Sequence, residues 1–106
     1  PLYIEPHLFY WTRLDANASA EIDYVIQHNT HIIPIEIKSG STGTLKSLHQ
    51  FIEAADHPYA IRMYAGPLKV EKAVTPNKKP YLLMNLPYYA GTALLQYIEW
   101  FVGQKI

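Results

Sequence analysis

The sequence predicts an α/β domain with a central mixed β-sheet flanked by helices. Residues 21–28 and 31–38 alternate polar and apolar side chains with the period of two that is typical of strands. Residues 45–55 instead repeat apolar side chains at helical spacing, which gives one apolar stripe. Further apolar runs at 59–65 and 81–85 predict two more strands after this helix, and strands that alternate with helices indicate the α/β class.

The remaining elements follow from local signals. The aromatic run at 8–12 predicts a first strand, and the small polar residues at 15–19 predict a turn. The helix is expected to begin near Thr44, a favoured N-cap type, and to stop at Asp56-His57-Pro58. Residues 69–75 are compatible with a short strand or an irregular excursion, 76–80 with a loop, and 88–101 with a closing helix.

Size and composition limit the function classes. The chain has 106 residues, which is enough for one compact domain. Nine basic residues balance nine acidic ones, and this argues against strong non-specific binding to nucleic acid. Cysteine is absent, which excludes disulfides and fits a reducing cytoplasm. Neither a signal peptide nor an apolar run of about 18 residues is visible, so we expect a cytoplasmic domain that does not contact a membrane.

The segment between residues 21 and 38 concentrates the polar chemistry. A two-residue turn at Asn29-Thr30 would close a hairpin in which Asp23 lies opposite Glu36. Counted from the turn, this pair is of the non-hydrogen-bonded type, so its Cβ atoms are expected roughly 4.5–5.5 Å apart on one face. The same count places Glu21 opposite Lys38.

Two carboxylates placed opposite each other repel, and a proton, a bound cation or a nearby lysine would compensate them. Magnesium and similar hard divalent ions take oxygen ligands, which Asp23, Glu36 and the carbonyl of Ile37 would supply. The Lys38 ammonium lies two residues beyond Glu36 on the same predicted face, where it would position or activate a water that attacks a phosphodiester. The residues themselves therefore predict a Mg²⁺ or Mn²⁺ site, with Asp23, Glu36 and Lys38 as catalytic residues.

These residues resemble a known signature. Asp23 followed by Glu36-Ile37-Lys38 is similar to the PD-(D/E)xK nuclease motif, in which an acidic residue on one strand precedes E-x-K on the next. The ordered set of segments at 10–13, 21–26, 33–40, 45–52 and 86–87 resembles the uncharacterised domain that follows the ATPase module in prokaryotic AAA-type ATPases.

This resemblance implies a restriction-endonuclease-like core and a metal-dependent endonuclease or DNA-processing activity. It also implies that residues 1–106 form a single domain, the C-terminal piece of a longer protein, with its own ATPase module as a partner and ATP bound only there. The family core begins with a helix before the first strand, and that helix is expected to be missing here.

Other interpretations remain open. The polar face can be an ordinary solvated sheet surface, and the fold can be a catalytically silent interaction domain that serves the ATPase. Residues 40–47 follow a strand and open a helix, but Leu45 stands where a phosphate-binding loop needs glycine, so a helix-capping loop is the better interpretation. The five histidines are better explained as exposed turn residues than as metal ligands. Lysines in the second half of the chain fit a solvated loop better than a basic edge for nucleic acid; they are Lys69, Lys72, Lys78 and Lys79.

The sequence also bears on whether two copies of the chain associate. Without its first helix the sheet would leave one apolar face bare, and residues 88–101 are more apolar than a free surface helix. This terminal helix can fold back onto the bare face, or it can pack against a second copy and bury Trp100 and Phe101 between chains. The low charge content favours the homodimer.

Overall fold

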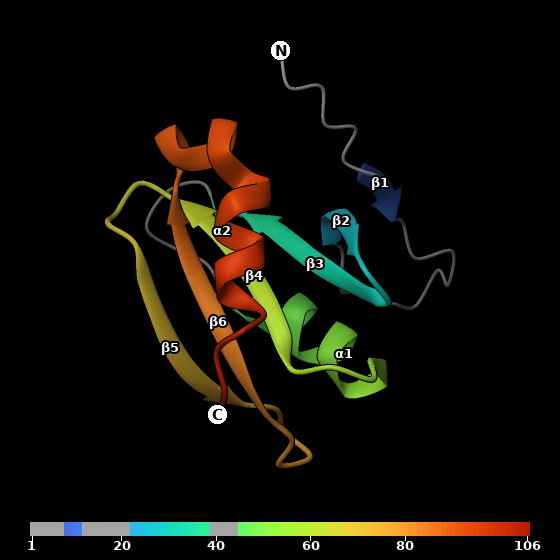
Figure 1. The fold of residues 1–106 in the computed structure, drawn as a ribbon. Helices are drawn as coiled ribbons and strands as arrows, with labels where there is room; N and C mark the ends of the chain where they lie inside the picture. Colours follow the sequence, from blue (N-terminus) through green and yellow to red (C-terminus); the bar gives the residue numbers. More distant parts are fainter. Residues whose placement is uncertain (1–7, 12–21, 39–44) are drawn as a thin grey trace.

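The structure is a computed structural model, and it describes residues 8–11, 22–38 and 45–106. Within these ranges the chain forms one sheet and three helical segments (Figure 1). In chain order these elements are β1 (Leu8–Trp11), β2 (Ile22–His28), β3 (His31–Ile37), α1 (Lys46–Ala54), β4 (Tyr59–Tyr64), β5 (Lys69–Val74), β6 (Pro80–Pro87), the 3₁₀ helix η1 (Tyr88–Ala93) and α2 (Leu94–Phe101).

The sheet is mixed and has the strand order β1-β2-β3-β4-β6-β5. The first three strands pair in antiparallel fashion, whereas β4 lies parallel to both β3 and β6, and β5 closes the far edge in antiparallel fashion. A parallel pair needs a crossover connection, which α1 provides between β3 and β4. The predicted α/β architecture, a central mixed sheet flanked by helices, is therefore confirmed.

The hairpin of β2 and β3 has the predicted register. Its strands pair from His28 with His31 back to Tyr24 with Ile35, across a turn in which Asn29 has a φ of 56°. Asparagine tolerates this left-handed conformation better than most residues, so Asn29 suits a tight hairpin turn. Pairing with β4 begins only at Ile35, one residue after Pro34, which has no N–H to donate.

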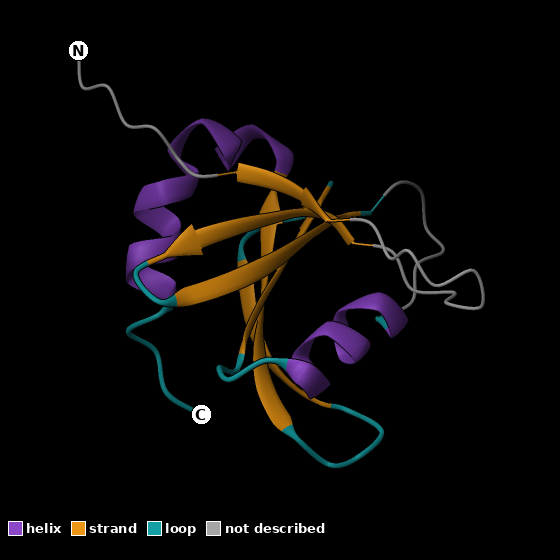
Figure 2. Cartoon of the chain, turned by 90° about the vertical axis from the view of Figure 1, so that its right-hand side faces the viewer, coloured by secondary structure: helices purple, strands orange, loops and turns teal. Residues whose placement is uncertain are grey.

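The two faces of the sheet carry separate apolar cores. Figure 2 shows helices on both sides of the sheet. On one face α1 buries Leu48 and Ile52 against residues that include Val25 and Leu83. On the other face α2 buries Ile98 and Phe101 against a second set that includes Ile33, Ile61 and Met84. The period-two pattern of each strand thus supplies both cores, since alternate side chains point to opposite faces.

Several local expectations need correction or completion. Residues 69–74 form a regular edge strand rather than an irregular excursion, because all six pair with β6. The closing helix is split: residues 88–93 are 3₁₀, and the α-helix begins only at Leu94. Gly91 lies within the 3₁₀ segment, and glycine is a poor α-helix former. Helix α1 begins at Lys46, with Leu45 at its N-cap position and no hydrogen bond from a capping side chain. Thr44, the expected N-cap, and the rest of the loop at 40–44 lie outside the described residues.

The terminal helix folds back onto the sheet of its own chain. Phe101 is fully buried there, and its ring meets Tyr59 edge-on at 5.2 Å between centroids, so its expected burial between two copies was wrong. Trp100 stays half exposed. The face that was expected to be bare is therefore covered by α2. In the described part of the chain, no helix has the length and apolarity that crossing a bilayer requires.

Candidate metal site and its charged surroundings

Asp23 and Glu36 lie near each other at the open end of the β2–β3 hairpin, where the negative charge of Asp23 acts on Glu36. The paired register of the hairpin ends at Tyr24 and Ile35, one residue before Asp23 and Glu36, and the pairing of β1 with β2 is irregular between Val25 and Ile22. Asp23 is exposed, and Glu36 is half-buried. The first of these carboxylates is thus open to solvent, while the second is partly shielded from it.

The Asp23 carboxylate is fixed by the backbone of the next strand. Its Oδ2 accepts a hydrogen bond of 2.8 Å from the N–H of Ile37. In a strand the N–H and C=O of one residue point to the same neighbour, so the Ile37 carbonyl is also directed towards β2.

The two carboxylates influence each other electrostatically. Burial raises the pKa of Glu36 above its ordinary value, and the negative charge of Asp23 raises it further. The guanidinium of Arg62 acts in the opposite direction and lowers this pKa. The ionised Glu36 is therefore incompletely compensated, which is the electrostatic setting that a bound cation would relieve.

Lys38 follows the last residue of β3. Its backbone N–H donates to Met63 at 2.8 Å, and its carbonyl accepts a hydrogen bond from the Tyr88 hydroxyl. The charges that shift the Glu36 pKa do not include the Lys38 ammonium, although Arg62 on β4 is among them. Glu21, the predicted partner of Lys38, lies outside the described residues.

Sequence reasoning missed the neighbour on the other side of Glu36. Arg62 pairs with Glu36 across β3 and β4, and Asn85 pairs with Arg62 across β4 and β6. The guanidinium donates through Nε to Asn85 Oδ1 at 3.0 Å, and its Nη2 lies 3.8 Å from Glu71 Oε2. Asn85 in turn donates to Glu71 Oε2 at 2.7 Å. Parallel pairing of β3 with β4 creates this polar row, which consists of Glu36, Arg62, Asn85 and Glu71. No local spacing in the sequence predicts it.

Tyr81 connects this polar row to α1. Its ring is fully buried, and its hydroxyl lies 3.1 Å from His49 Nδ1 on the helix. Burial raises the pKa of Tyr81 to about 12, and the nearby carboxylates Glu36 and Glu71 add to the rise against the opposing charge of Arg62. The phenol is therefore neutral at ordinary pH and serves as a hydrogen-bonding group.

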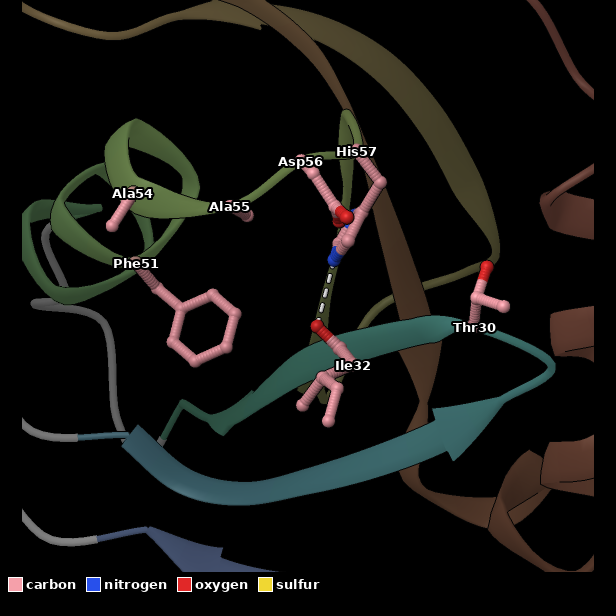
Figure 3. Close-up of a pocket in the computed structure, with 7 residues that line it drawn as sticks. All are labelled: Thr30, Ile32, Phe51, Ala54, Ala55, Asp56 and His57. Carbon is pink, nitrogen blue, oxygen red and sulfur yellow. Dashed lines mark hydrogen bonds between the residues drawn. The ribbon is translucent and has the colours of Figure 1, made fainter.

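A hollow of about 340 Å³ lies elsewhere, between the C-terminal end of α1 and the turn end of the hairpin (Figure 3). Its lining combines apolar side chains, such as Ile32 and Phe51, with polar ones, and Asp56 is the carboxylate beside it. His57 in this wall uses both ring nitrogens: Nδ1 accepts from the Tyr59 N–H at 3.0 Å, and Nε2 donates to the Ile32 carbonyl at 2.7 Å. His57 is thus a buried structural residue, which corrects the expectation of an exposed turn histidine.

Lys79 also has a structural position. Its ammonium donates to the carbonyls of Ile52 and Ala55 at 2.7 and 2.6 Å, at the C-terminal end of α1. A cation interacts favourably with the last carbonyls of a helix, and here it adds to the hydrogen bond that the Ile52 carbonyl already accepts from the Ala55 N–H. The expectation that Lys79 belongs to a solvated loop was therefore wrong for this residue.

The donor set fits a hard divalent cation rather than a softer metal. Asp23, Glu36 and the Ile37 carbonyl offer oxygen atoms, and magnesium is commonly held by one or two carboxylates with retained water. Among the described residues no cluster of three or more histidine, aspartate or glutamate side chains is placed to hold a metal. The described part of the chain therefore offers two carboxylates, those of Asp23 and Glu36, to such a site.

Comparison with known proteins gives a family without a stated activity. A family described as a domain of unknown function (DUF4143) matches residues 1–82. No curated protein and no solved structure matches the chain.

Proposed function

Because this chain belongs to the DUF4143 family, whose description states no activity, we propose a function from its own residues. The chain is a PD-(D/E)xK nuclease-like domain that binds Mg²⁺ or Mn²⁺ and hydrolyses phosphodiester bonds in DNA. The observation that supports this proposal is the proximity of Asp23 to the end of β3, where its carboxylate bonds to the Ile37 N–H and its charge raises the pKa of Glu36.

The arrangement supports a cation site in three ways. The Ile37 N–H holds the Asp23 carboxylate at the end of β3, so part of its conformational freedom is already lost before a cation binds. Glu36 is half-buried, and its pKa is raised by burial and then by Asp23, so its charge needs compensation. Arg62 supplies only part of that compensation, since its guanidinium is bound to Asn85 and lies near Glu71.

Each residue then has a separate task in the proposed reaction. Asp23, Glu36 and the Ile37 carbonyl hold the cation, which when bound supplies charge stabilisation at the phosphate. Lys38 is expected to orient the attacking water through its ammonium. The DNA partner, and an ATPase module in the same protein, are parts of this proposal that rest on the resemblance of the motif.

Metal binding is the direct test. A ligand that binds only the native state raises thermal stability, so millimolar Mn²⁺ is expected to raise the melting temperature of the chain. Glu36→Gln is expected to abolish this response, whereas Glu99→Gln, which removes an exposed carboxylate on α2, is expected to retain it. Cleavage of plasmid DNA in Mg²⁺ or Mn²⁺ is measured on the same three proteins.

The outcomes separate the candidate functions. Metal stabilisation together with cleavage that Glu36→Gln removes would support the nuclease. Equal melting curves with and without metal, and intact DNA, would instead identify a catalytically silent interaction domain.

A further inference from the structure

Arg62 stands between two carboxylates and contacts only one of them. Glu36 is its direct partner on β3, at the separation of about 4.8 Å that neighbouring strands have. Glu71 lies two strands away in the other direction, on β5. Nevertheless the guanidinium approaches Glu71 to 3.8 Å, and within the described residues no ion pair joins it to Glu36.

Asn85 explains why the Arg62 guanidinium points towards Glu71 rather than Glu36. It lies on β6, between Arg62 and β5, and is almost fully buried. Its Oδ1 accepts from Arg62 Nε at 3.0 Å, while its Nδ2 donates to Glu71 Oε2 at 2.7 Å and to the Lys69 carbonyl at 3.2 Å. One amide thus holds both the guanidinium and the carboxylate that attracts it.

The consequence concerns the proposed cation site. A guanidinium matches a carboxylate in geometry and charge, so a free Arg62 would bind Glu36 in place of a metal. We propose that Asn85 and Glu71 are positioning residues that hold Arg62 away from Glu36 and so keep this carboxylate available to a divalent cation. This inference rests on the proposed function, because it concerns access of the cation to Glu36.

The choice of variants excludes a change of net charge near the site as the cause of weaker Mn²⁺ binding. Asn85 is neutral, so Asn85→Ala changes no charge near the site, and any loss of Mn²⁺ affinity must come through another group. We expect Asn85→Ala to weaken Mn²⁺ binding by about fivefold or more, measured by titration calorimetry. In an Arg62→Gln background the same Asn85→Ala change is expected to have no effect, because no guanidinium is left to move onto Glu36.

A second double-mutant cycle, of Glu71 with Arg62, provides the test if the variant of the buried Asn85 does not fold. Glu71 lies on the edge strand with its side chain 35% exposed, so Glu71→Gln is a milder change. Simple electrostatics predicts the same loss of Mn²⁺ affinity from Glu71→Gln with or without Arg62. The positioning role predicts a larger loss when Arg62 is present, a non-additivity that a double-mutant cycle measures. Circular dichroism and melting curves establish which variants are folded.

The results distinguish the two proposals. If the wild-type chain binds Mn²⁺ and the changes at Asn85 and Glu71 are additive with Arg62→Gln, the positioning role is overturned and the metal site stands. If the wild-type chain binds no Mn²⁺, both are overturned. Coupling in either cycle supports the positioning role.

Discussion

The carboxylate of Asp23 accepts a hydrogen bond of 2.8 Å from the backbone N–H of Ile37, across the open end of the β2–β3 hairpin. The same side chain therefore has two separable roles. It closes the last position of the strand pair, and it presents a negative charge beside Glu36.

Substitutions at Asp23 separate these roles. Asp23→Asn retains an oxygen acceptor for the Ile37 N–H, so we expect unfolding free energy close to that of wild type but no stabilisation by Mn²⁺. Asp23→Ala removes the acceptor as well and is expected to cost about 0.5–1.5 kcal/mol, the usual net value of one hydrogen bond. Urea unfolding with and without Mn²⁺ measures both effects. Retained Mn²⁺ stabilisation in Asp23→Asn would argue against Asp23 as a ligand.

Glu36 is expected to destabilise the metal-free fold at neutral pH. Its pKa in the folded state is raised, first by burial and then by Asp23, so its contribution to stability is fully present below the ordinary value of 4.5 and is lost as the pH rises through the folded pKa. Glu36→Gln is accordingly expected to be more stable than wild type by up to about 1 kcal/mol at pH 7 without metal. At pH 4 the difference should disappear. Urea unfolding at the two pH values provides the check, and a destabilised Glu36→Gln at pH 7 would contradict it.

His57 predicts a second pH dependence, of opposite sign. Burial is the largest cause that lowers its pKa below the ordinary 6.5. The unfolded state therefore binds the proton more readily, and stability is expected to fall as the pH decreases from about 7 through 6.5 and below. Protonation would also remove the acceptor that Nδ1 offers to the Tyr59 N–H.

The variant His57→Gln tests this assignment. It removes the titrating ring, so its melting temperature is expected to vary less than that of wild type between pH 7 and pH 5. His49→Gln is the matched control, because His49 is a partly buried histidine on α1 rather than beside Tyr59. An unchanged pH profile in His57→Gln would show that another group causes the dependence.

Lys79 is expected to stabilise α1 through its two carbonyl contacts. Lys79→Met retains the aliphatic stem but loses the ammonium, and we expect it to reduce the unfolding free energy by about 1–2 kcal/mol. Lys78→Met provides the control on the neighbouring residue, which is exposed. Equal losses in the two variants would mean that the contacts of Lys79 contribute nothing specific.

Phe101 is expected to stabilise the single chain rather than a dimer. Its fully buried ring packs in the core beneath α2, so Phe101→Ala should cost about 3–5 kcal/mol. Trp100 is half exposed, and Trp100→Ala should cost much less. Chemical denaturation measures both losses. Midpoints that rise with protein concentration in the wild-type chain would contradict a fold that α2 completes within one copy.

The sequence by itself determined the elements that depend on local pattern. Period-two alternation and a two-residue turn were sufficient for the hairpin and its register from His28–His31 to Tyr24–Ile35, because a register closed by a short turn leaves few alternatives. The apolar stripe from Leu45 to Ile52 likewise indicated α1 and the face that it buries.

Only the tertiary structure decided which distant residues meet. Arg62 lies beside Glu36 through the pairing of β3 with β4, and it meets Asn85 and Glu71 through the pairings of β4 with β6 and β6 with β5. The partners in these pairings are separated in sequence by helices and loops. Lys79 and His57 acquire their contacts in the same way, from segments more than 20 residues apart. Sequence patterns record which side of a strand is buried, but the choice of neighbouring strand depends on how the crossover helix packs, and this packing is a property of the whole fold.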